Sequence, residues 1–325
     1  MPTLHLCVTS AGRRVELINS LRVDARSLNL EPQITAIDLN ANLSAASQLA
    51  DQSHSIVRCT DRQYIPQLIQ ICRENKVQIL IPTIDTELAI LAENKETFVQ
   101  NNIHIVVSSR DAVRIARDKY LTAQILEQAK ISSPKTLLLT DLLQANGVIN
   151  YPVVLKRIDG SSSIGLCFAQ NFDEVKSLRL DENSYIAQEK CLGPEYTINC
   201  YVDQKGNLRA AVPHRRIETR GGEVSKGVTE RRADLHQLAH QIVEVLPGLR
   251  GPFCFQAILT IKGPVVFEIN ARFGGGYPLA HAAGATFGKW IIQEALGLTC
   301  SANDDWEDGL LMLRYDGAVF KKLHS

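Results

Sequence analysis

Residues 265–278 read VVFEINARFGGGYP: three apolar residues, which predict a strand buried at its start, run into Glu268, and polar residues then alternate with small or apolar ones. Because strand side chains repeat with a period of two, Glu268, Asn270 and Arg272 are predicted to share one face, about 7 Å apart. A carboxylate, an amide and a guanidinium together suit Mg²⁺ and phosphate. The three glycines that follow predict a tight turn and a close approach to a bulky group. The same residues would also be found on an exposed sheet face followed by a turn. Other segments of the sequence must therefore distinguish a binding site from an exposed face.

The composition is that of an ordinary globular protein: 325 residues, 45% hydrophobic and 22% charged, enough for two or three lobes. The 35 basic residues balance the 35 acidic ones, which argues against nucleic acid or an anionic membrane surface as a partner. The sequence has no apolar window of membrane-spanning length, and its first apolar run is too short for a signal peptide. Eight cysteines without a CxxC pair favour free thiols and a cytoplasmic location over zinc ligation.

The first hundred residues alternate short apolar runs with helical patterns, which predicts a doubly wound α/β domain. The opening unit is a strand at residues 4–8, a small-residue turn with Gly12, and a helix. One glycine is too few for a dinucleotide fingerprint, so NAD binding has weak support. Ligands in such sheets lie beyond the carboxyl ends of the strands, which makes Arg13 and Glu87 candidate substrate residues. Glu87 could equally be an acidic residue in the first turn of a helix.

Two lysines and a Gly/Ser-rich loop lie in the middle of the chain. Lys119 belongs to a helical pattern at residues 112–129, where a charged solvent face is the plain interpretation. Lys156 ends a strand at residues 151–157 and precedes DGSSSIGL, residues 159–166. An ammonium group beside several backbone N–H groups can hold phosphate oxygens. The run of turn-type residues exceeds what a tight hairpin needs, so a phosphate-binding flap is favoured over a polar hairpin tip.

Residues 185–199 predict two strands joined by a Gly-Pro turn, with Glu189 and Glu195 on either side of it. Such a hinge offers backbone groups to a purine edge and a carboxylate to ribose hydroxyls, although the signal is weak alone. Residues 213–232 then gather six basic side chains around a Gly-Gly pair. A solvated charge run is the usual explanation. The glycines and the bidentate geometry of arginine favour a mobile loop that grips an anionic substrate.

Residues 253–261 predict a strand that alternates apolar side chains on one side with Gln256 on the other. Gly263 and Pro264 then turn the chain directly into residues 265–278. Gln256 and Glu268 are therefore predicted to be cross-strand neighbours.

Taken in order, these segments resemble the ATP-grasp superfamily, and more narrowly its members that look like a fragment of the carbamoyl-phosphate synthase large subunit. Members present a helix lysine, a strand lysine before a Gly-rich flap, a hinge of the form EKxLxGxE, and an acceptor strand paired with an E-x-N-x-R strand. The resemblance implies an α/β fold, with α+β ATP lobes. It places a doubly wound, Rossmann-like pre-ATP-grasp domain at residues 1–110, a small lobe with the flap at 111–187, and a C-terminal lobe with the Mg-ATP and substrate site at 188–325.

The resemblance also implies roles for the matching residues. The ATP-binding set is Lys119, Lys156, Ser162, Ser163, Gly165, Glu189, Lys190, Leu192 and Glu195. Within it, the main chain of Lys190 and Leu192 would read the adenine and Glu195 would take the ribose hydroxyls, while the flap residue that caps the phosphates stays open. The ligands of one or two Mg²⁺ ions, or Mn²⁺, would be Gln256, Glu268 and Asn270. The implied catalytic residues are Arg272 and Lys156. Candidates for substrate contacts are Arg13, Glu87, His214, Arg216 and Arg220.

The activity implied by the resemblance is ATP-dependent carboxylate–amine ligation through an acyl phosphate, with release of ADP and phosphate. Phosphoryl transfer needs positioning and charge neutralisation rather than a protein nucleophile. Two alternatives stay open: carbamoyl-phosphate synthase-like phosphorylation of bicarbonate or carbamate, and an ATP-binding regulatory module without turnover. The expected partners are small-molecule carboxylate and amine substrates and a second copy in a homodimer, with neither nucleic acid nor a membrane.

Overall fold

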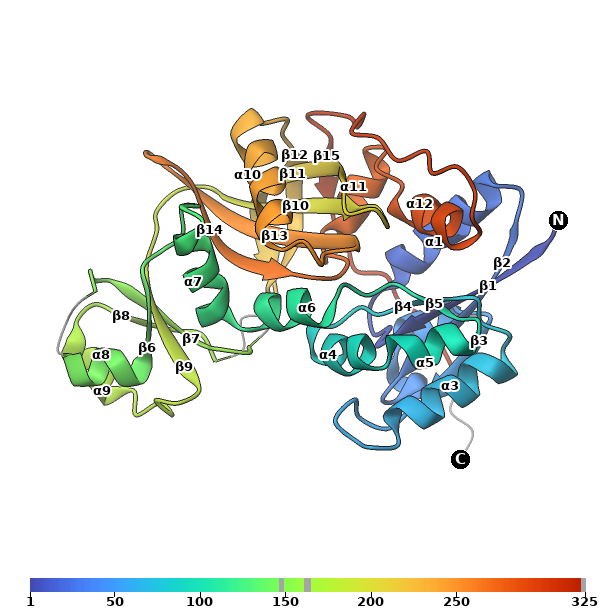
Figure 1. Ribbon diagram of the computed structural model, residues 1–325, viewed down its shortest axis with the longest axis horizontal. Coiled ribbons are helices and arrows are strands. Elements are labelled where there is room, and N and C mark those ends of the chain that lie inside the picture. The colour runs from blue at the N-terminus through green and yellow to red at the C-terminus, as the bar shows by residue number, and fades with distance from the viewer. Residues whose placement is uncertain (146–148, 161–164, 323–325) are drawn as a thin grey trace.

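The computed structural model describes residues 1–145, 149–160 and 165–322, and within them the chain forms three β-sheets (Figure 1). The N-terminal sheet is parallel, in the order β3-β2-β1-β4-β5. Its strands are β1 (Thr3–Thr9), β2 (Glu31–Asp38), β3 (Gln52–Ser55), β4 (Ile79–Ile81) and β5 (His104–Ile105). Its helices are α1 (Val15–Ser27), η1 (Ala41–Leu43), α2 (Ala45–Leu49), α3 (Tyr64–Glu74), α4 (Asp85–Glu93) and α5 (Lys95–Gln100).

The central strand β1 is buried on both faces. Leu6 packs in one core with Leu21 of α1, whereas Cys7 packs in another with Leu68 of α3. A parallel strand covered on both sides needs a nearly continuous apolar run, which explains LHLCV at residues 4–8. Helices therefore cover both faces of the sheet, and the predicted doubly wound α/β domain is confirmed.

The smallest lobe has a four-stranded antiparallel sheet in the order β6-β9-β7-β8. Its elements are β6 (Thr136–Leu138), α8 (Leu139–Ala145), β7 (Val153–Arg157), β8 (Cys167–Ala169), α9 (Phe172–Ser177) and β9 (Tyr185–Glu189). Leu142, Leu155 and Val175 belong to a core that is separate from the other two. The lobe is therefore a packing unit of its own, and it lies apart from the rest of the molecule at the left of Figure 1.

The largest sheet has six strands in the order β14-β13-β10-β11-β12-β15. They are β10 (Glu195–Val202), β11 (Leu208–Arg220), β12 (Glu223–Thr229), β13 (Gly251–Thr260), β14 (Gly263–Asn270) and β15 (Leu311–Leu313). The helices beside it are α6 (Arg110–Arg117), α7 (Lys119–Gln128), α10 (Ala233–Val245), α11 (Tyr277–Ala282) and α12 (Phe287–Ala295). α10 contacts β10 and β11, whereas α6 and α7 contact β14. The contacts of α7 bring that helix beside the hairpin of β13 and β14.

The basic segment at residues 213–232 is mostly a β-hairpin rather than the predicted mobile loop. It falls on β11 and β12, which pair from His214 with Thr229 to Arg220 with Glu223. Gly221 and Gly222 make the turn, with φ of 57° and 78°. Two successive positive φ values suit a tight hairpin whose twist matches the strands. The Gly-Gly pair therefore reverses the chain within the sheet, and the arginines are held at fixed strand positions.

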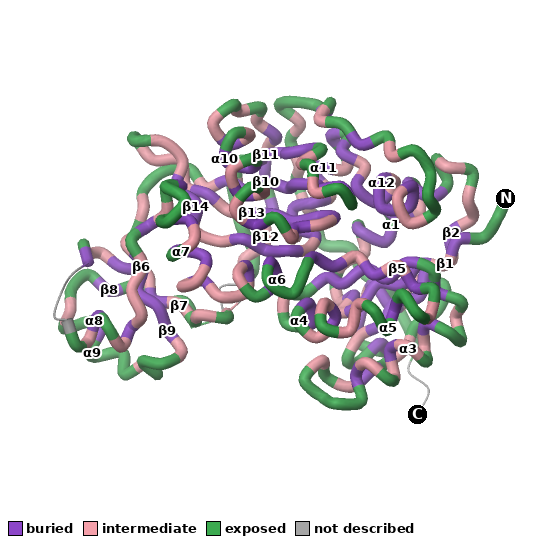
Figure 2. Tube along the Cα trace, viewed as in Figure 1, coloured by how far each residue is buried: buried purple, intermediate pink, exposed green. Residues whose placement is uncertain are grey.

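The N-terminal domain and the six-stranded sheet share their cores. Trp290 of α12 packs in one core with Ile18 and Leu21 of α1, and Phe253 of β13 belongs to the same core as Leu80 of β4. Fully burying one such side chain stabilises the fold by about 1.5–3 kcal/mol. Figure 2 shows buried segments in both of these parts. Within the residues that the structure covers, no helix has both the length and the apolar character needed to cross a membrane.

Candidate active site

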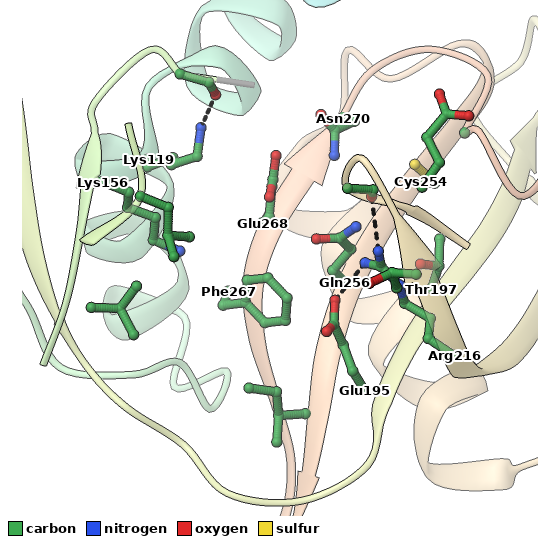
Figure 3. Close-up of a pocket in the computed structure, with 18 of the residues that line it drawn as sticks. Lys119, Lys156, Glu195, Thr197, Arg216, Cys254, Gln256, Phe267, Glu268 and Asn270 are labelled. Atoms are coloured by element: carbon green, nitrogen blue, oxygen red, sulfur yellow. Dashed lines mark hydrogen bonds and ion pairs between the residues drawn. The ribbon is translucent and has the colours of Figure 1, made fainter. Parts of the chain in front are cut away.

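A cavity of about 390 Å³ lies between the small lobe and the six-stranded sheet (Figure 3). Lys119 and Lys156 face it from one side, and Glu268 and Gln256 face it from the other. Arg272 and the glycine loop at residues 274–276 line it as well. The fold therefore gathers these five predicted site residues around one space, although they come from α7, β7, β13, β14 and the segment after β14. Five more predicted site residues line the same cavity: Glu189, Lys190, Glu195, Arg216 and Asn270.

The hairpin of β13 and β14 sets the floor of this cavity. Its register pairs Gln256 with Glu268, so the predicted cross-strand neighbours are confirmed. The register then shifts and pairs Ala257 with Val266, which leaves Phe267 as the extra residue of a β-bulge. Phe267 and Glu268 consequently both line the cavity, although they are adjacent in sequence. The apolar run of residues 265–267 predicted a buried Phe267, and the bulge is the reason that this prediction is wrong.

The predicted cation ligands form a short chain of contacts. In the orientation that satisfies both amide atoms, Gln256 donates to Glu268 Oε2 at 3.2 Å and accepts from Arg216 Nη1 at 2.8 Å. Asn270 is buried, and its Oδ1 accepts from Arg272 Nη2 at 3.1 Å. The Asn270 oxygen has a second lone pair for a cation, whereas Gln256 would have to turn its amide oxygen from Arg216 toward Glu268 to share one with that carboxylate. One carboxylate and two amides fit Mg²⁺ that shares the phosphates of a nucleotide, since Mg²⁺ is usually held by one or two carboxylates together with substrate oxygens.

The described residues contain no group of three or more His, Cys, Asp or Glu side chains arranged to hold a metal. A metal site built only from charged and imidazole ligands is therefore absent from this part of the chain. The chemistry of the donor set requires phosphate oxygens to complete the coordination of any Mg²⁺ bound at Glu268.

The two lysines occupy the opposite wall. Lys119 is the first residue of α7, is 8% exposed, and donates from Nζ to the carbonyl oxygen of Gly160. Lys156 lies on β7, with its Nζ 5.1 Å from the centroid of the Phe267 ring. Burial lowers the pKa of Lys156 to about 8, although the nearby Glu268 acts in the opposite direction. The two ammonium groups thus face Glu268 across the cavity. The whole cavity lining has seven Lys and Arg residues against four Glu residues, which leaves cationic character for an anionic ligand.

The pKa of Lys156 predicts a pH dependence for ATP binding. With a pKa of about 8, the ammonium is charged below that pH and neutral above it. If Lys156 holds a phosphate, KM for ATP should rise by about tenfold between about pH 7 and about pH 9.5. In Lys156→Arg the guanidinium stays charged over this range, so KM for ATP should change much less. An equal rise in both proteins would assign the pH dependence to another group.

The hinge between β9 and β10 borders the cavity. Glu189 accepts at Oε1 from the backbone N and the Nδ2 of Asn150, at 3.0 and 2.8 Å. The backbone N–H of Lys190 donates to Pro152 at 3.0 Å, and the Leu192 side chain is 75% exposed and does not line the cavity. The N–H of Lys190 is therefore already used within the protein. The predicted adenine contacts by the other main-chain atoms of Lys190 and Leu192 remain a prediction.

Glu195 opens β10 and lines the cavity, where its Oε1 accepts from Arg216 Nη1. Arg216, a predicted substrate residue, lines the cavity between Glu195 and Gln256, and its contact with a substrate remains a prediction. Among the predicted flap residues, Gly165 is described and does not line the cavity. Ser162 and Ser163 lie outside the described residues.

Arg272 connects the cavity to the N-terminal domain. Its Nη2 and Nε donate to Oδ2 of Asp85 at 2.8 and 3.2 Å, and its Nη1 donates to the carbonyl oxygen of Phe273 at 3.1 Å. The two charged side chains are only 14% and 10% exposed. Burial lowers the pKa of Arg272, but Asp85 more than offsets this and raises it above its ordinary value, so the group stays cationic. Asp85 is a site residue that the sequence did not reveal.

Two predicted substrate residues have structural roles instead. Glu87 is fully buried and accepts from Ser10, Tyr64 and the backbone N of Thr83, at 3.0, 2.8 and 2.9 Å. It belongs to the first turn of α4, so the helix alternative was the correct one. His214 is also fully buried, and burial lowers its pKa to about 3, so it stays neutral. Neither side chain lines the cavity.

The glycine loop packs against protein side chains. A Cβ on Gly275 would lie 2.7 Å from Cδ of Glu223, and one on Gly276 would lie 2.6 Å from the ring of His214. None of the three glycines has a positive φ. The predicted close approach is therefore present and is made to Glu223 and His214, whereas no glycine-only backbone conformation is needed.

Gly276→Ala should lower the free energy of unfolding by about 2 kcal/mol, because the new methyl group overlaps the buried His214 ring and forces repacking. Gly317→Ala is the matched control, since a Cβ at Gly317 has no heavy atom within 4 Å and its φ is not positive. Urea unfolding of both variants measures the difference. Equal midpoints for the two variants would show that the loop has room to move away from His214.

Comparison with known proteins adds independent evidence. Residues 6–106 match the family described as PylC-like, N-terminal domain, and residues 116–276 match the ATP-grasp domain family. A phosphoribosylamine–glycine ligase from Caldanaerobacter subterraneus subsp. tengcongensis is 23% identical over 241 residues, which cover 65% of this chain. The match spans just 57% of that relative.

Solved structures share the fold at low identity. The biotin carboxylase domain of 2-oxoglutarate carboxylase from Hydrogenobacter thermophilus, in complex with MgADP, ADP and bicarbonate, has a TM-score of 0.74 at 15% identity; the match covers 94% of this chain and 73% of that one. The L-amino acid ligase from Bacillus licheniformis gives 0.70 at 18% identity, covering 91% and 75%. N5-carboxyaminoimidazole ribonucleotide synthetase from Thermotoga maritima gives 0.67 at 17%, covering 94% and 79%.

Proposed function

The chain has an ATP-grasp domain preceded by a PylC-like N-terminal domain, and from this premise we propose that it is an ATP-dependent carboxylate–amine ligase. One observation carries the proposal. Lys119 and Lys156 face Glu268 across a single cavity, and Arg272 lines the same space. Cations on one wall and a cation-binding carboxylate on the other are what a bound Mg-nucleotide requires.

In the proposed complex, Lys119 and Lys156 bind phosphate oxygens of ATP. Glu268, with the amide oxygens of Gln256 and Asn270, would hold Mg²⁺, or Mn²⁺, which supplies charge neutralisation at the phosphates. Glu195 stands at the β10 end of the cavity, where the family resemblance puts the ribose. Its partner Arg216 keeps the carboxylate in place and also orients Gln256.

The proposed reaction has two steps. A carboxylate oxygen of the substrate attacks the γ-phosphorus, the bond from that phosphorus to the β–γ bridging oxygen breaks, and ADP leaves. An amine then attacks the carbonyl carbon of the acyl phosphate, loses a proton, and expels inorganic phosphate to leave an amide. Arg272 stabilises the charge on the transferred phosphoryl group. Cys254 is near, but burial raises its pKa to about 11, so it is a neutral thiol and not a competing nucleophile.

The release of ADP tests this proposal. The protein is incubated with ATP, Mg²⁺, and pooled carboxylates and amines, with each pool also omitted in turn. A ligase releases ADP at the full rate only when both pools are present. ADP formation that does not depend on the amine would rule out the ligase reaction, and stimulation by bicarbonate alone would favour a carbamoyl-phosphate synthase-like reaction.

A further inference from the structure

A second groove, of about 770 Å³, adjoins the ATP cavity. The start of α1 and the end of α2 form one side of this groove. Residues 273–282 and 310–319 form the other side. The two spaces share a junction, whose lining is Arg14, Glu223, Val224, Gly274 and Gly275. A molecule in the groove could therefore present one end to the γ-phosphate of a nucleotide in the ATP cavity.

The groove walls are largely apolar. They include Val15, Leu49, Phe273, Tyr277, Leu311 and Leu313. Leu49, Leu311 and Leu313 are 39%, 52% and 62% exposed, although all three line one concave surface. Single exposed apolar side chains need no explanation, whereas several gathered in a groove of ligand size indicate a binding site. The walls therefore fit a ligand with an apolar body.

The junction end of the groove carries excess positive charge. Glu223 accepts from Arg14 at 2.8 Å and from Arg314 at 3.2 Å, so two guanidinium groups share one carboxylate. Arg314 also donates to the carbonyl oxygen of Gly275 at 2.6 Å, which fixes it beside the glycine loop. Arg13 lines the groove and, within the described residues, forms no ion pair or side-chain hydrogen bond. Glu16 lines the groove as well, so Arg13, Arg14 and Arg314 face two carboxylates, and one ligand carboxylate would balance the remaining charge.

We infer that this groove binds the carboxylate substrate of the proposed ligase, and that this substrate has an apolar body of several carbons. The carboxylate lies at the junction, near Arg13 and Arg14, and the body lies along Leu49 and Leu313. A short or doubly charged carboxylate would leave the apolar walls in contact with water or place a second charge against them. The inference rests on the proposed function for the fate of the carboxylate, whereas binding itself can be measured without turnover.

Isothermal titration calorimetry of the full chain, with and without Mg²⁺ and ADP, tests the class of ligand. The probes are octanoate and 4-phenylbutyrate, compared with acetate and succinate. The expected Kd for octanoate is at least about tenfold lower than that for acetate, because burial of several CH₂ groups favours binding. Equal or tighter binding of acetate or succinate would overturn the inference.

Two variants locate the binding in this groove. Leu49→Ser should weaken octanoate about fivefold and leave acetate unchanged, since it removes apolar surface alone. Leu43→Ser is its control, because Leu43 is 79% exposed and does not line the groove. Arg13→Gln should weaken octanoate and acetate alike by about tenfold, as expected for loss of a charged partner. Arg62→Gln, at another exposed arginine, should change neither. If the Kd for octanoate were unchanged in both groove variants, the ligand would bind elsewhere and the inference would be contradicted.

Failure of the inference differs from failure of the proposed function. If octanoate binds in the groove but neither it nor any pooled carboxylate promotes amine-dependent ADP release, the groove assignment stands and the ligase proposal fails. If short or doubly charged carboxylates drive amine-dependent ADP release and octanoate neither binds nor reacts, the ligase proposal stands and the substrate class is wrong.

Discussion

Glu268→Gln should lower kcat for ADP release by about a thousandfold while leaving the protein folded. Glu268 is the only carboxylate among the three predicted Mg²⁺ ligands, and its side chain lines the ATP cavity beside Gln256. The amide has nearly the same shape but no charge, so it cannot neutralise a divalent cation that sits between the phosphates and the protein. Steady-state ADP release over a range of Mg²⁺ concentrations measures the effect.

Glu244→Gln is the matched control for that variant, because Glu244 is exposed on α10 and lies away from the cavity. It should keep wild-type activity, and both variants should melt near the wild-type temperature. The same pair separates an enzyme from a regulatory module that only binds ATP. If ADP formation and Mg²⁺-dependent protection by ATP were both unchanged in Glu268→Gln, the metal site would lie elsewhere.

Arg272→Gln should have two separable effects. It should lower kcat by about a thousandfold through the loss of a cation at the transferred phosphoryl group. It should also lower the free energy of unfolding by about 3 kcal/mol, since the buried Asp85 loses the partner that now lies 2.8 Å away. Kinetics of ADP release and urea unfolding measure the two effects on the same preparation.

The double variant Asp85→Asn/Arg272→Gln distinguishes catalysis from packing. Removal of both charges leaves no unpaired buried ion, so stability should return to within about 1 kcal/mol of the wild type. The kcat should stay as low as in Arg272→Gln, because the cation is still missing. Recovery of activity together with stability would show that Arg272 acts only as a structural link between the N-terminal domain and the ATP cavity.

The floor of the site could be predicted because it depends on local sequence. Residues 253–270 form one hairpin whose turn is at residues 261–262, whereas the predicted turn residues Gly263 and Pro264 already pair within β14. The short loop together with alternation sets which side chains are opposite. Gln256 and Glu268 therefore pair as predicted. The position of Phe267 on the cavity wall could not be predicted. A bulge changes the alternation by one residue, and the sequence here has no pattern that indicates a bulge.

Contacts between distant segments were beyond the reach of the sequence. Asp85 and Arg272 are 187 positions apart, and their pairing depends on how the N-terminal domain packs against the six-stranded sheet. The same packing creates the second groove, whose walls come from the first fifty residues and from the last third of the chain. Neither feature has a local pattern that could reveal it. The sequence pattern indicated Glu87, beyond the end of β4, as a site residue, whereas Asp85, two residues earlier, is the residue that contacts Arg272.

The arginines at residues 213–232 show how composition can mislead. A cluster of charge around two glycines is typical of a solvated loop, yet a two-glycine turn is equally a hairpin signal. Because these arginines have fixed positions on strands β11 and β12, they lie at different places in the structure. Arg216 reaches Glu195 in the ATP cavity, whereas Arg220 pairs with Asp316 at the second groove.

The most direct test of the proposed chemistry follows an oxygen atom. Pooled carboxylates labelled with ¹⁸O in the carboxyl group are incubated with the protein, amines, Mg²⁺ and ATP, and the released phosphate is examined by mass spectrometry. A ligase that forms an acyl phosphate transfers one carboxylate oxygen to each inorganic phosphate that accompanies ADP, so labelled phosphate is expected in proportion to ADP. ADP released with only unlabelled phosphate would contradict attack by the carboxylate on the γ-phosphate.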